Sequence, residues 1–444
     1  MYFMANSPEI SVQNASAGAA SLADRRIRHG TPAFRRTNLA LFSSGFATFG
    51  LLYCVQPLMP AFSHGFGIDA AASSLALSLT TGVLAVAMLF AGAISDAFGR
   101  KPIMLASLLG SSVLVLLSAM APTWGTFLVL RALLGITLAG LPAVAMTYVS
   151  EEIHGDSLGF AMGLYIGGNA IGGMGGRLIS GFAADHFSWR VAVAVIGALG
   201  LIASYLVARG LPASVHFEKR RARPRALLAS FGSLWRDDGL PWLFAEGFLL
   251  MGAFVTIYNY VAFRLLAAPF SLSQSHVGAI FMVYIIGVGS SAWMGSIAGK
   301  LGRRRVLWTT FIMMLAGVAL TASHSLWAIV AGIAMLTFGF FGGHSIASSW
   351  VGKRAGVAKA HASSFYLFSY YMGSSIAGSV GGLAWTVAGW NGVVAYVVVL
   401  VLAGLAVALK LRHLVPKASS PPVGPASPGT IEGTASQAAP ATAA

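Results

Sequence analysis

The chain has 444 residues, of which 57% are hydrophobic and only 9% charged, and its formal net charge at pH 7 is +15. Because an ordinary soluble domain carries about 25% charged residues, this composition excludes a water-soluble globular protein and predicts a chain whose main solvent is lipid. The positive charge does not indicate a nucleic-acid-binding protein, because the basic residues stand in short clusters between long apolar runs.

The apolar runs have the length of membrane-spanning helices, since a hydrocarbon core of about 30 Å takes about 20 helical residues. We therefore predict an all-α polytopic membrane protein with twelve transmembrane helices. The expected spans lie near residues 38–62, 74–97, 102–121, 125–149, 158–183 and 190–209, and then near 241–265, 276–298, 306–322, 326–350, 360–386 and 390–411.

The positions of Lys and Arg set the expected orientation. Of the 28 basic residues, 24 fall in the tails and loops on one side of the predicted membrane, and only Arg190 and Arg264 fall on the other. Arg131 and Arg177 lie inside apolar runs. Since cytoplasmic loops carry the excess of Lys and Arg, we expect both termini in the cytoplasm. The expected location is the bacterial inner membrane.

Composition also predicts the division into segments. Residues 1–36 lack the apolar stretch of a signal peptide and are expected to be a disordered cytoplasmic tail. Two six-helix halves follow, at 37–210 and 241–412, joined by a basic cytoplasmic linker at 211–240. Residues 413–444 contain almost no large apolar side chains, so a second disordered tail is expected there.

One loop occurs twice at the same place in the two halves. The first copy follows the second expected helix and has Gly92, Asp96, Gly99, Arg100 and Lys101. The second copy follows the eighth expected helix, 203 positions later, and has Gly299 where the first has its acid. Only the first copy can therefore form an acid-dependent contact. The second copy keeps Gly295, Gly302, Arg303 and Arg304.

This repeated loop resembles the cytoplasmic motif of the major facilitator superfamily. The resemblance implies two pseudo-symmetric six-helix halves that rock around a shared substrate site, with the motif closing the cytoplasmic side. Further strings resemble the bacterial YnfM-type transporters, near the sugar- and drug-efflux branch. These are Gln56-Pro57-Leu-Met-Pro60, Asn169 to Arg177, Ser188-Trp189-Arg190 and Phe244-Ala-Glu246-Gly-Phe.

The fifth expected helix is rich in glycine. Gly168, Gly172 and Gly176 recur at every fourth position and form a smooth stripe on which another helix can pack closely. We expect Gly163 to be a helix-packing glycine as well, and these four glycines together resemble the antiporter motif of proton-driven efflux members of the superfamily. The usual proline after the last glycine is replaced here by Arg177, so the sequence departs from that motif.

Placing a charged side chain inside a bilayer costs free energy, so such residues indicate a structural or functional role. Arg131, with Gly135 and Ala139, is similar to a further proton-antiporter motif, and it is expected to bind an anion, modulate a proton site or extend to the outer interface. Glu246 is the leading proton-carrier candidate, against the alternative of an ordinary ion pair near the cytoplasmic surface. His344 is a third proton-coupling candidate, or else a hydrogen-bonding group.

Other candidates belong to the substrate cavity, which in this superfamily is lined by helices 1, 4, 7 and 10. Arg177 is expected either to meet substrate or to hold Asp185 or a carbonyl group. Polar edges on helices 1 and 7 complete the set, namely Tyr53, Gln56, Tyr258, Asn259 and Tyr260.

The favoured function is proton-coupled efflux of small organic solutes such as sugars or drugs by a monomeric transporter. Transport of organic anions, with Arg131 and Arg177 as counter-ions, is the alternative. A membrane-embedded enzyme is disfavoured, because the chain has no Cys–His pair, no His-x-x-x-His spacing and no paired intramembrane carboxylates. The expected partners are a small-molecule substrate, protons and lipid, without nucleic acid, cofactor or metal.

Overall fold

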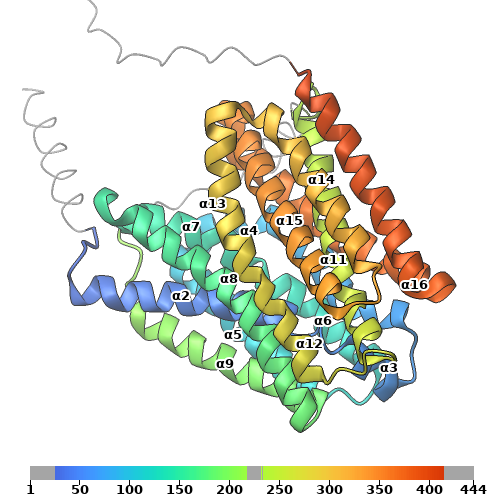
Figure 1. The fold of residues 1–444 in the computed structure, drawn as a ribbon. Coiled ribbons are helices and arrows are strands. Elements are labelled where there is room, and N and C mark those ends of the chain that lie inside the picture. The colour runs from blue at the N-terminus through green and yellow to red at the C-terminus, as the bar shows by residue number, and fades with distance from the viewer. Residues whose placement is uncertain (1–25, 218–231, 233, 415–444) are drawn as a thin grey trace, which may run out of the picture. The chain divides into compact units, whose positions relative to one another are not determined.

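The computed structural model describes residues 26–217, 232 and 234–414, and these are almost entirely helical (Figure 1). Within these ranges no strand is present, and the one isolated β-bridge joins Ile27 to Ile153. Residues 1–25, the centre of the predicted basic linker and the last thirty residues, with the predictions made for them, lie outside the described residues.

The first set of helices covers the first six predicted spans. Two of those spans are interrupted, the first between α2 and α3 and the fourth between α6 and α7. The helices are α2 (Pro32–Tyr53), α3 (Met59–Phe66), α4 (Ala70–Phe98), α5 (Arg100–Ala119), α6 (Trp124–Leu138), α7 (Gly140–Glu152), α8 (Gly155–His186) and α9 (Trp189–Gly210).

The second set covers the remaining predicted spans. Its last helix is bent at Ala388 and Gly389, where the backbone leaves the helical region, so that α16 contains two of the predicted runs. The elements are α11 (Leu240–Leu266), α12 (Gln274–Ile280), the 3₁₀ turn η1 (Phe281–Val283), α13 (Tyr284–Leu301), α14 (Arg303–Thr321), α15 (Leu326–Ala355), the 3₁₀ turn η2 (Gly356–Ala358) and α16 (Lys359–Arg412).

Side-chain caps explain where several helices begin. Thr31, Asp69, Thr123 and Ser188 each accept a hydrogen bond from a backbone N–H of the first turn of the helix that follows. That N–H has no partner within the helix itself. These polar residues therefore fix the starts of α2, α4, α6 and α9.

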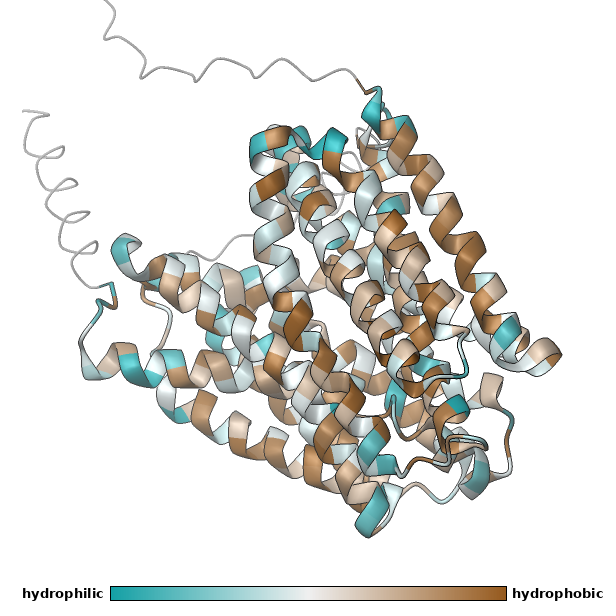
Figure 2. Cartoon of the chain, in the orientation of Figure 1, coloured by the Kyte–Doolittle hydropathy of each residue, from teal (hydrophilic) through white to brown (hydrophobic). Residues whose placement is uncertain are grey.

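By length and hydropathy, nine helices among the described residues are able to cross a membrane. The helices α2 and α8 are not among the nine, and α16 counts once although it holds two predicted runs. The all-helical class is thus confirmed, and the number of twelve spans stays a prediction. Figure 2 shows apolar residues along the lengths of the helices and hydrophilic residues gathered near their ends.

The expected tail and linker are partly ordered. The predicted disorder of 1–36 is wrong for its last residues, because α2 begins at Pro32 and Ile27 pairs with the chain after α7. Ile27 N–H donates to the Glu152 carbonyl at 2.9 Å, and its own carbonyl accepts from His154 N–H at 3.0 Å. In the linker, His216 bonds the Glu152 carboxylate through its backbone N–H at 3.0 Å.

The glycine stripe of α8 packs on α2. A Cβ added at Gly168 or Gly172 would overlap the backbone of Phe42 or Phe46, and one at Gly176 would lie 2.7 Å from Gly50 Cα. Small residues permit this close helix approach. Gly163 differs and corrects the prediction, because it is exposed and a Cβ there would meet no atom within 4 Å.

Candidate functional site

A chain of polar contacts joins the two sets of helices near the break between α2 and α3. Arg177 of α8 donates from Nε to Gln56 Oε1 at 2.7 Å. Gln56 then donates from Nε2 to Asn259 Oδ1 of α11 at 2.8 Å. All three side chains are fully or almost fully buried. The structure thus brings together three residues that the sequence placed separately in the cavity.

Aromatic rings surround the Arg177 guanidinium. Its central carbon lies 4.3 Å from the ring centroid of Tyr53, 4.7 Å from that of Tyr284 and 5.2 Å from that of Phe281. Such faces stabilise a cation that has lost water. Its NH1 group also donates to the Gly173 carbonyl at 2.5 Å. Of the two internal partners expected for Arg177, the structure shows a carbonyl and places Asp185 against Ser275.

Arg131 binds backbone carbonyls rather than a neighbouring acid. Its three nitrogens donate to the carbonyls of Ala76, Leu51 and Leu52 at 2.7, 3.3 and 2.9 Å. The last two carbonyls belong to the final turn of α2, where helical partners run out because the chain turns toward Pro57. The side chain is only 1% exposed, so it does not extend to the outer interface. Arg131 therefore caps the interrupted first span.

Glu246 stands alone in the interior of the second set. It is 0% exposed, and neither carboxyl oxygen has a hydrogen-bond partner among the described residues. The Tyr366 ring covers the adjacent Gly247, where an added Cβ would lie 2.9 Å from it. The Tyr366 hydroxyl in turn lies 3.0 Å from His344 Nδ1. The ion pair considered for Glu246 is thus not formed within the described ranges.

The remaining predicted cavity residues face different neighbours. The Tyr258 hydroxyl lies 2.7 Å from Thr337 Oγ1 of α15, inside the second set of helices. The Tyr260 hydroxyl donates to the Gly378 carbonyl at 2.9 Å and therefore ties α11 to α16. Both side chains are fully buried, so each is held by the protein itself in this conformation.

The first copy of the repeated motif forms an ion-pair cluster. Arg100 NH1 lies 2.6 Å from Asp96 Oδ1 and 3.1 Å from Ser95 Oγ. Its Nε and NH2 contact both oxygens of Glu151, at the end of α7, at 3.1 and 2.9 Å. Glu151 was missed by the sequence analysis, because only the fold brings residue 151 to residue 100. Lys101 Nζ donates to the carbonyls of Ala208 and Leu211.

The second copy has the same turn with different partners. Gly99 and Gly302 have φ angles of 98° and 93°, a region that favours glycine and explains why both copies keep it. Arg303 donates to Ser349 Oγ at 2.9 Å, and Arg304 to the Leu414 carbonyl at 3.4 Å. Near this loop the buried ion pair is between Asp237 and Arg354, two residues that carried no motif signal.

An aromatic cluster beside the polar chain also escaped prediction. Phe254 stacks on Phe340 with centroids 3.8 Å apart, and the Tyr370 ring lies 4.8 Å from that of His344. The residues of this cluster come from α11, α13, α15 and α16, so no local sequence pattern could have predicted that they lie together. Further members are Tyr284, Phe341 and Tyr371.

Comparison with known proteins decides the family. The model of the Major Facilitator Superfamily matches residues 41–267 and 249–440. The chain belongs to the major facilitator superfamily. It is 50% identical over 387 residues to the inner membrane transport protein YnfM of Escherichia coli, covering 87% of this chain and 93% of that protein. The MFS-type transporter YybF of Bacillus subtilis is 47% identical over 379 residues, covering 85% and 94%.

A solved structure of another transporter homolog shares the fold. It is a bacterial homolog of the human lysosomal transporter Spinster in an inward-facing and occupied conformation, with a TM-score of 0.72 at 13% identity, covering 86% of this chain and 97% of that chain. The expected resemblance to the superfamily and to YnfM is confirmed. This major facilitator chain is accordingly a membrane transport protein for small molecules and not an enzyme.

Proposed function

We propose that the protein is a proton-coupled antiporter that exports small organic solutes by alternating access. Its twelve spans would form two six-helix halves, α2–α9 and α11–α16, with both termini in the cytoplasm. The observation that carries the coupling is the buried carboxyl of Glu246. The bond from Gln56 to Asn259 supports a shared central site, because it links the two halves at the level where α2 is interrupted.

The environment of Glu246 supports the proposed proton coupling. A charged carboxylate with neither water nor a hydrogen-bond donor is strongly disfavoured in a low-dielectric interior. Both Glu246 oxygens lack donors in the part of the chain that the structure describes, so the neutral acid is the form that fits this conformation. A conformation that hydrates the side chain would allow it to ionise. Alternation between the two would carry one proton per cycle.

Tyr366 and His344 provide a polar route next to this group. The Tyr366 ring packs on Gly247, the residue that follows Glu246 in α11, and its hydroxyl lies 3.0 Å from His344 Nδ1. A hydroxyl and an imidazole can each both accept and donate a proton. His344 would therefore assist transfer rather than carry the proton itself. This assigns His344 a supporting role and Glu246 the principal one.

The surroundings of Arg177 fit a solute with a planar or polar surface. Tyr53 and Tyr284 offer ring faces and hydroxyl groups from opposite halves, and Phe281 adds an apolar face. Sites for small molecules combine such apolar walls with a few fixed polar groups. The organic-anion alternative rests on Arg177, because the Arg131 donors are already used by three carbonyls.

The test is transport by the full chain in proteoliposomes with an imposed pH gradient. A neutral sugar, an organic acid and a cationic dye would be offered in parallel, and the flux of solute and of protons would both be recorded. We expect a gradient-driven flux that Glu246→Gln uncouples, with solute exchange at equal pH retained. Asp238→Asn is the control: it removes an exposed acid just before α11, the helix that carries Glu246, and should leave coupling unchanged.

Each outcome has a definite meaning. If the unaltered protein transports solute at a rate that does not depend on the pH gradient, proton coupling is refuted. Coupling that survives in Glu246→Gln would remove that carboxyl from the mechanism. Transport of the organic acid alone would favour the anion alternative.

A further inference from the structure

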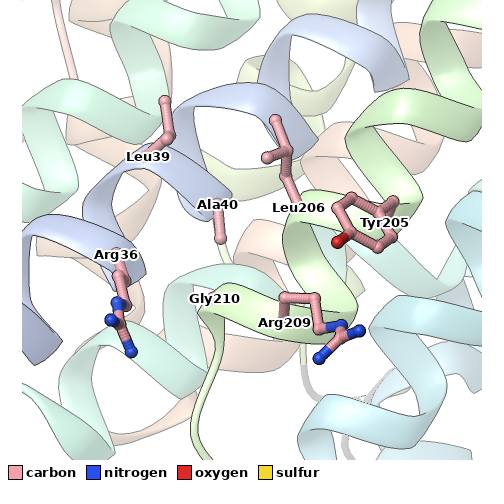
Figure 3. A pocket seen from close by; sticks show the side chains of 7 residues that line it. All are labelled: Arg36, Leu39, Ala40, Tyr205, Leu206, Arg209 and Gly210. Atoms are coloured by element: carbon pink, nitrogen blue, oxygen red, sulfur yellow. The ribbon is translucent and has the colours of Figure 1, made fainter.

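A groove opens between the first and last helices of the first half. Its volume is about 380 Å³, and Figure 3 shows its lining residues. The helices approach closely there, since a Cβ at Gly210 would lie 2.8 Å from the Arg36 carbonyl oxygen and 2.9 Å from Ala40 Cβ. The groove is lined by Arg36, Leu39 and Ala40 of α2 and by Tyr205, Leu206, Arg209 and Gly210 of α9.

The groove is cationic at one end and apolar at the other. In Figure 3 the guanidinium groups of Arg36 and Arg209 lie toward the same end, and Leu39 and Leu206 lie toward the opposite one. Leu39 is 53% exposed and Tyr205 is 60% exposed, so the apolar part belongs to the outer surface of the helices. The lining contains no acidic residue.

A second groove occupies the corresponding place in the second half. It lies between the start of α11 and the end of α16 and has a volume of about 510 Å³. Its basic residues include Arg236 and Lys410, but Asp237 and Asp238 also line it. Lys410 Nζ is held 3.5 Å from the ring centroid of Trp242. The two halves therefore have similar grooves with different charge.

We propose that the groove between α2 and α9 binds an anionic phospholipid, and that the groove between α11 and α16 does not. Arg36 and Arg209 would attract the anionic headgroup from the two sides of the groove, and the planar donors of arginine are well suited to its phosphate. One acyl chain would lie along Leu39 and Leu206. Basic residues at a membrane surface attract anionic lipids. In the second groove Asp238 opposes such binding, Asp237 is paired with Arg354, and Lys410 is held against Trp242.

A lipid is favoured over free phosphate because the charged end is continuous with exposed apolar side chains. A phosphate ion would use only the arginines and would leave the exposed Leu39 without a role, whereas Tyr205 already lies against Arg209, with 5.6 Å between its ring centroid and the guanidinium carbon. The proposal depends on the helices lying in a membrane. It does not depend on proton coupling or on the transported solute, so failure of either leaves it standing.

The test is native mass spectrometry of the purified full chain in detergent. The protein would be titrated separately with phosphatidylglycerol, phosphatidylcholine and inorganic phosphate. Arg36→Gln/Arg209→Gln removes the proposed site, and Arg236→Gln/Lys410→Gln is a control with the same change of charge. We expect retained phosphatidylglycerol in the unaltered protein, a loss of about tenfold in affinity in the first double variant, and no change in the control.

Several results would overturn the proposal. Equal losses in both double variants would show attraction by net charge alone. Equal retention of phosphatidylcholine would show binding of any lipid, and competition by phosphate at the same concentration would show an ion site. The pair Arg36→Lys/Arg209→Lys guards against misfolding, because it keeps both charges. It should bind phosphatidylglycerol more tightly than the glutamine pair, and equal binding by the two pairs would also count against the site.

Discussion

The side-chain nitrogen of Gln56 donates a 2.8 Å hydrogen bond to Asn259 Oδ1, and the two residues are 203 positions apart. The same separation relates Gly92 to Gly295 in the repeated loop. Gln56 and Asn259 therefore occupy corresponding positions of the duplicated halves and meet each other directly. Two equivalent residues make such a contact where the axis relating the halves passes, which is the place expected for the central site of a transporter.

Asn259→Leu should weaken the junction between the halves. The variant leaves the Gln56 nitrogen buried without its acceptor, at a cost of about 1–2 kcal/mol. We expect a roughly tenfold smaller population of molecules with the halves joined there. Spin labels at Phe187 and Trp327, one in each half and both well exposed, would report the distance between them.

A matched control is available for this variant. Asn38 donates to the Phe34 carbonyl of its own helix at 2.9 Å, so Asn38→Leu removes a similar buried bond without touching the junction. It should lower thermal stability and leave the label distances unchanged. Identical distance distributions for both variants would show that the Gln56–Asn259 bond does not hold the halves together.

Asp96→Asn should shift the protein toward the conformation that is open to the cytoplasm. Arg100 keeps Glu151 but loses the charge of Asp96, whose side chain is 36% exposed, so we expect an effect of about 1 kcal/mol. Labels at Asp156 and Leu301 would measure it across the two halves. An unchanged distribution would contradict a gating role for this contact.

Gly299→Asp tests the same idea in the second copy. Gly299 is exposed and a Cβ there meets no atom within 4 Å, so the new side chain fits. The aspartate would stand four residues before Arg303, as Asp96 stands before Arg100. Because Asp96 pairs with Arg100 across the equivalent glycine turn of the first copy, we expect a new pair here and a shift opposite in sign to that of Asp96→Asn. A shift in the same direction would refute equivalence of the two loops.

Arg131→Met should destabilise the protein without changing proton coupling. Three carbonyls would lose a charged donor at the end of α2 and on α4, and the expected loss of stability is about 3 kcal/mol or more. Thermal unfolding in detergent would measure the loss. Arg131→Lys keeps the charge but has a single nitrogen, so it should be intermediate. An altered pH profile of transport in a stable Arg131 variant would restore this residue to the coupling mechanism.

Two glycine-to-alanine substitutions on α8 test whether close packing, and not glycine content as such, stabilises this helix. They are Gly172→Ala and Gly163→Ala. An alanine at 172 would overlap the Phe46 backbone and should cost about 1–3 kcal/mol, whereas an alanine at 163 enters open space. The melting temperature of the first variant should fall by several degrees and that of the second should not change. Equal melting temperatures would show that α2 and α8 can move apart freely.

The sequence by itself determined the helical class, the repeated loop and the family. These features depend on local patterns, since apolar length defines a helix in lipid and a left-handed turn demands glycine. The packing stripe at Gly168, Gly172 and Gly176 could be predicted because it too is a local pattern, a glycine at every fourth position. Gly163 was assigned wrongly because its spacing does not show which face of α8 it occupies.

Only the tertiary structure decided the partners of the buried polar residues. Arg131 caps carbonyls of α2, Arg100 reaches Glu151, and Arg177 contacts Gln56. A buried charge takes whichever donor or acceptor the packed helices bring within about 3 Å, and that neighbour is set by long-range packing. Glu246 is the opposite case, because the packed helices bring no hydrogen-bond partner among the described residues to its carboxyl group. Its neighbours in the sequence do not predict this.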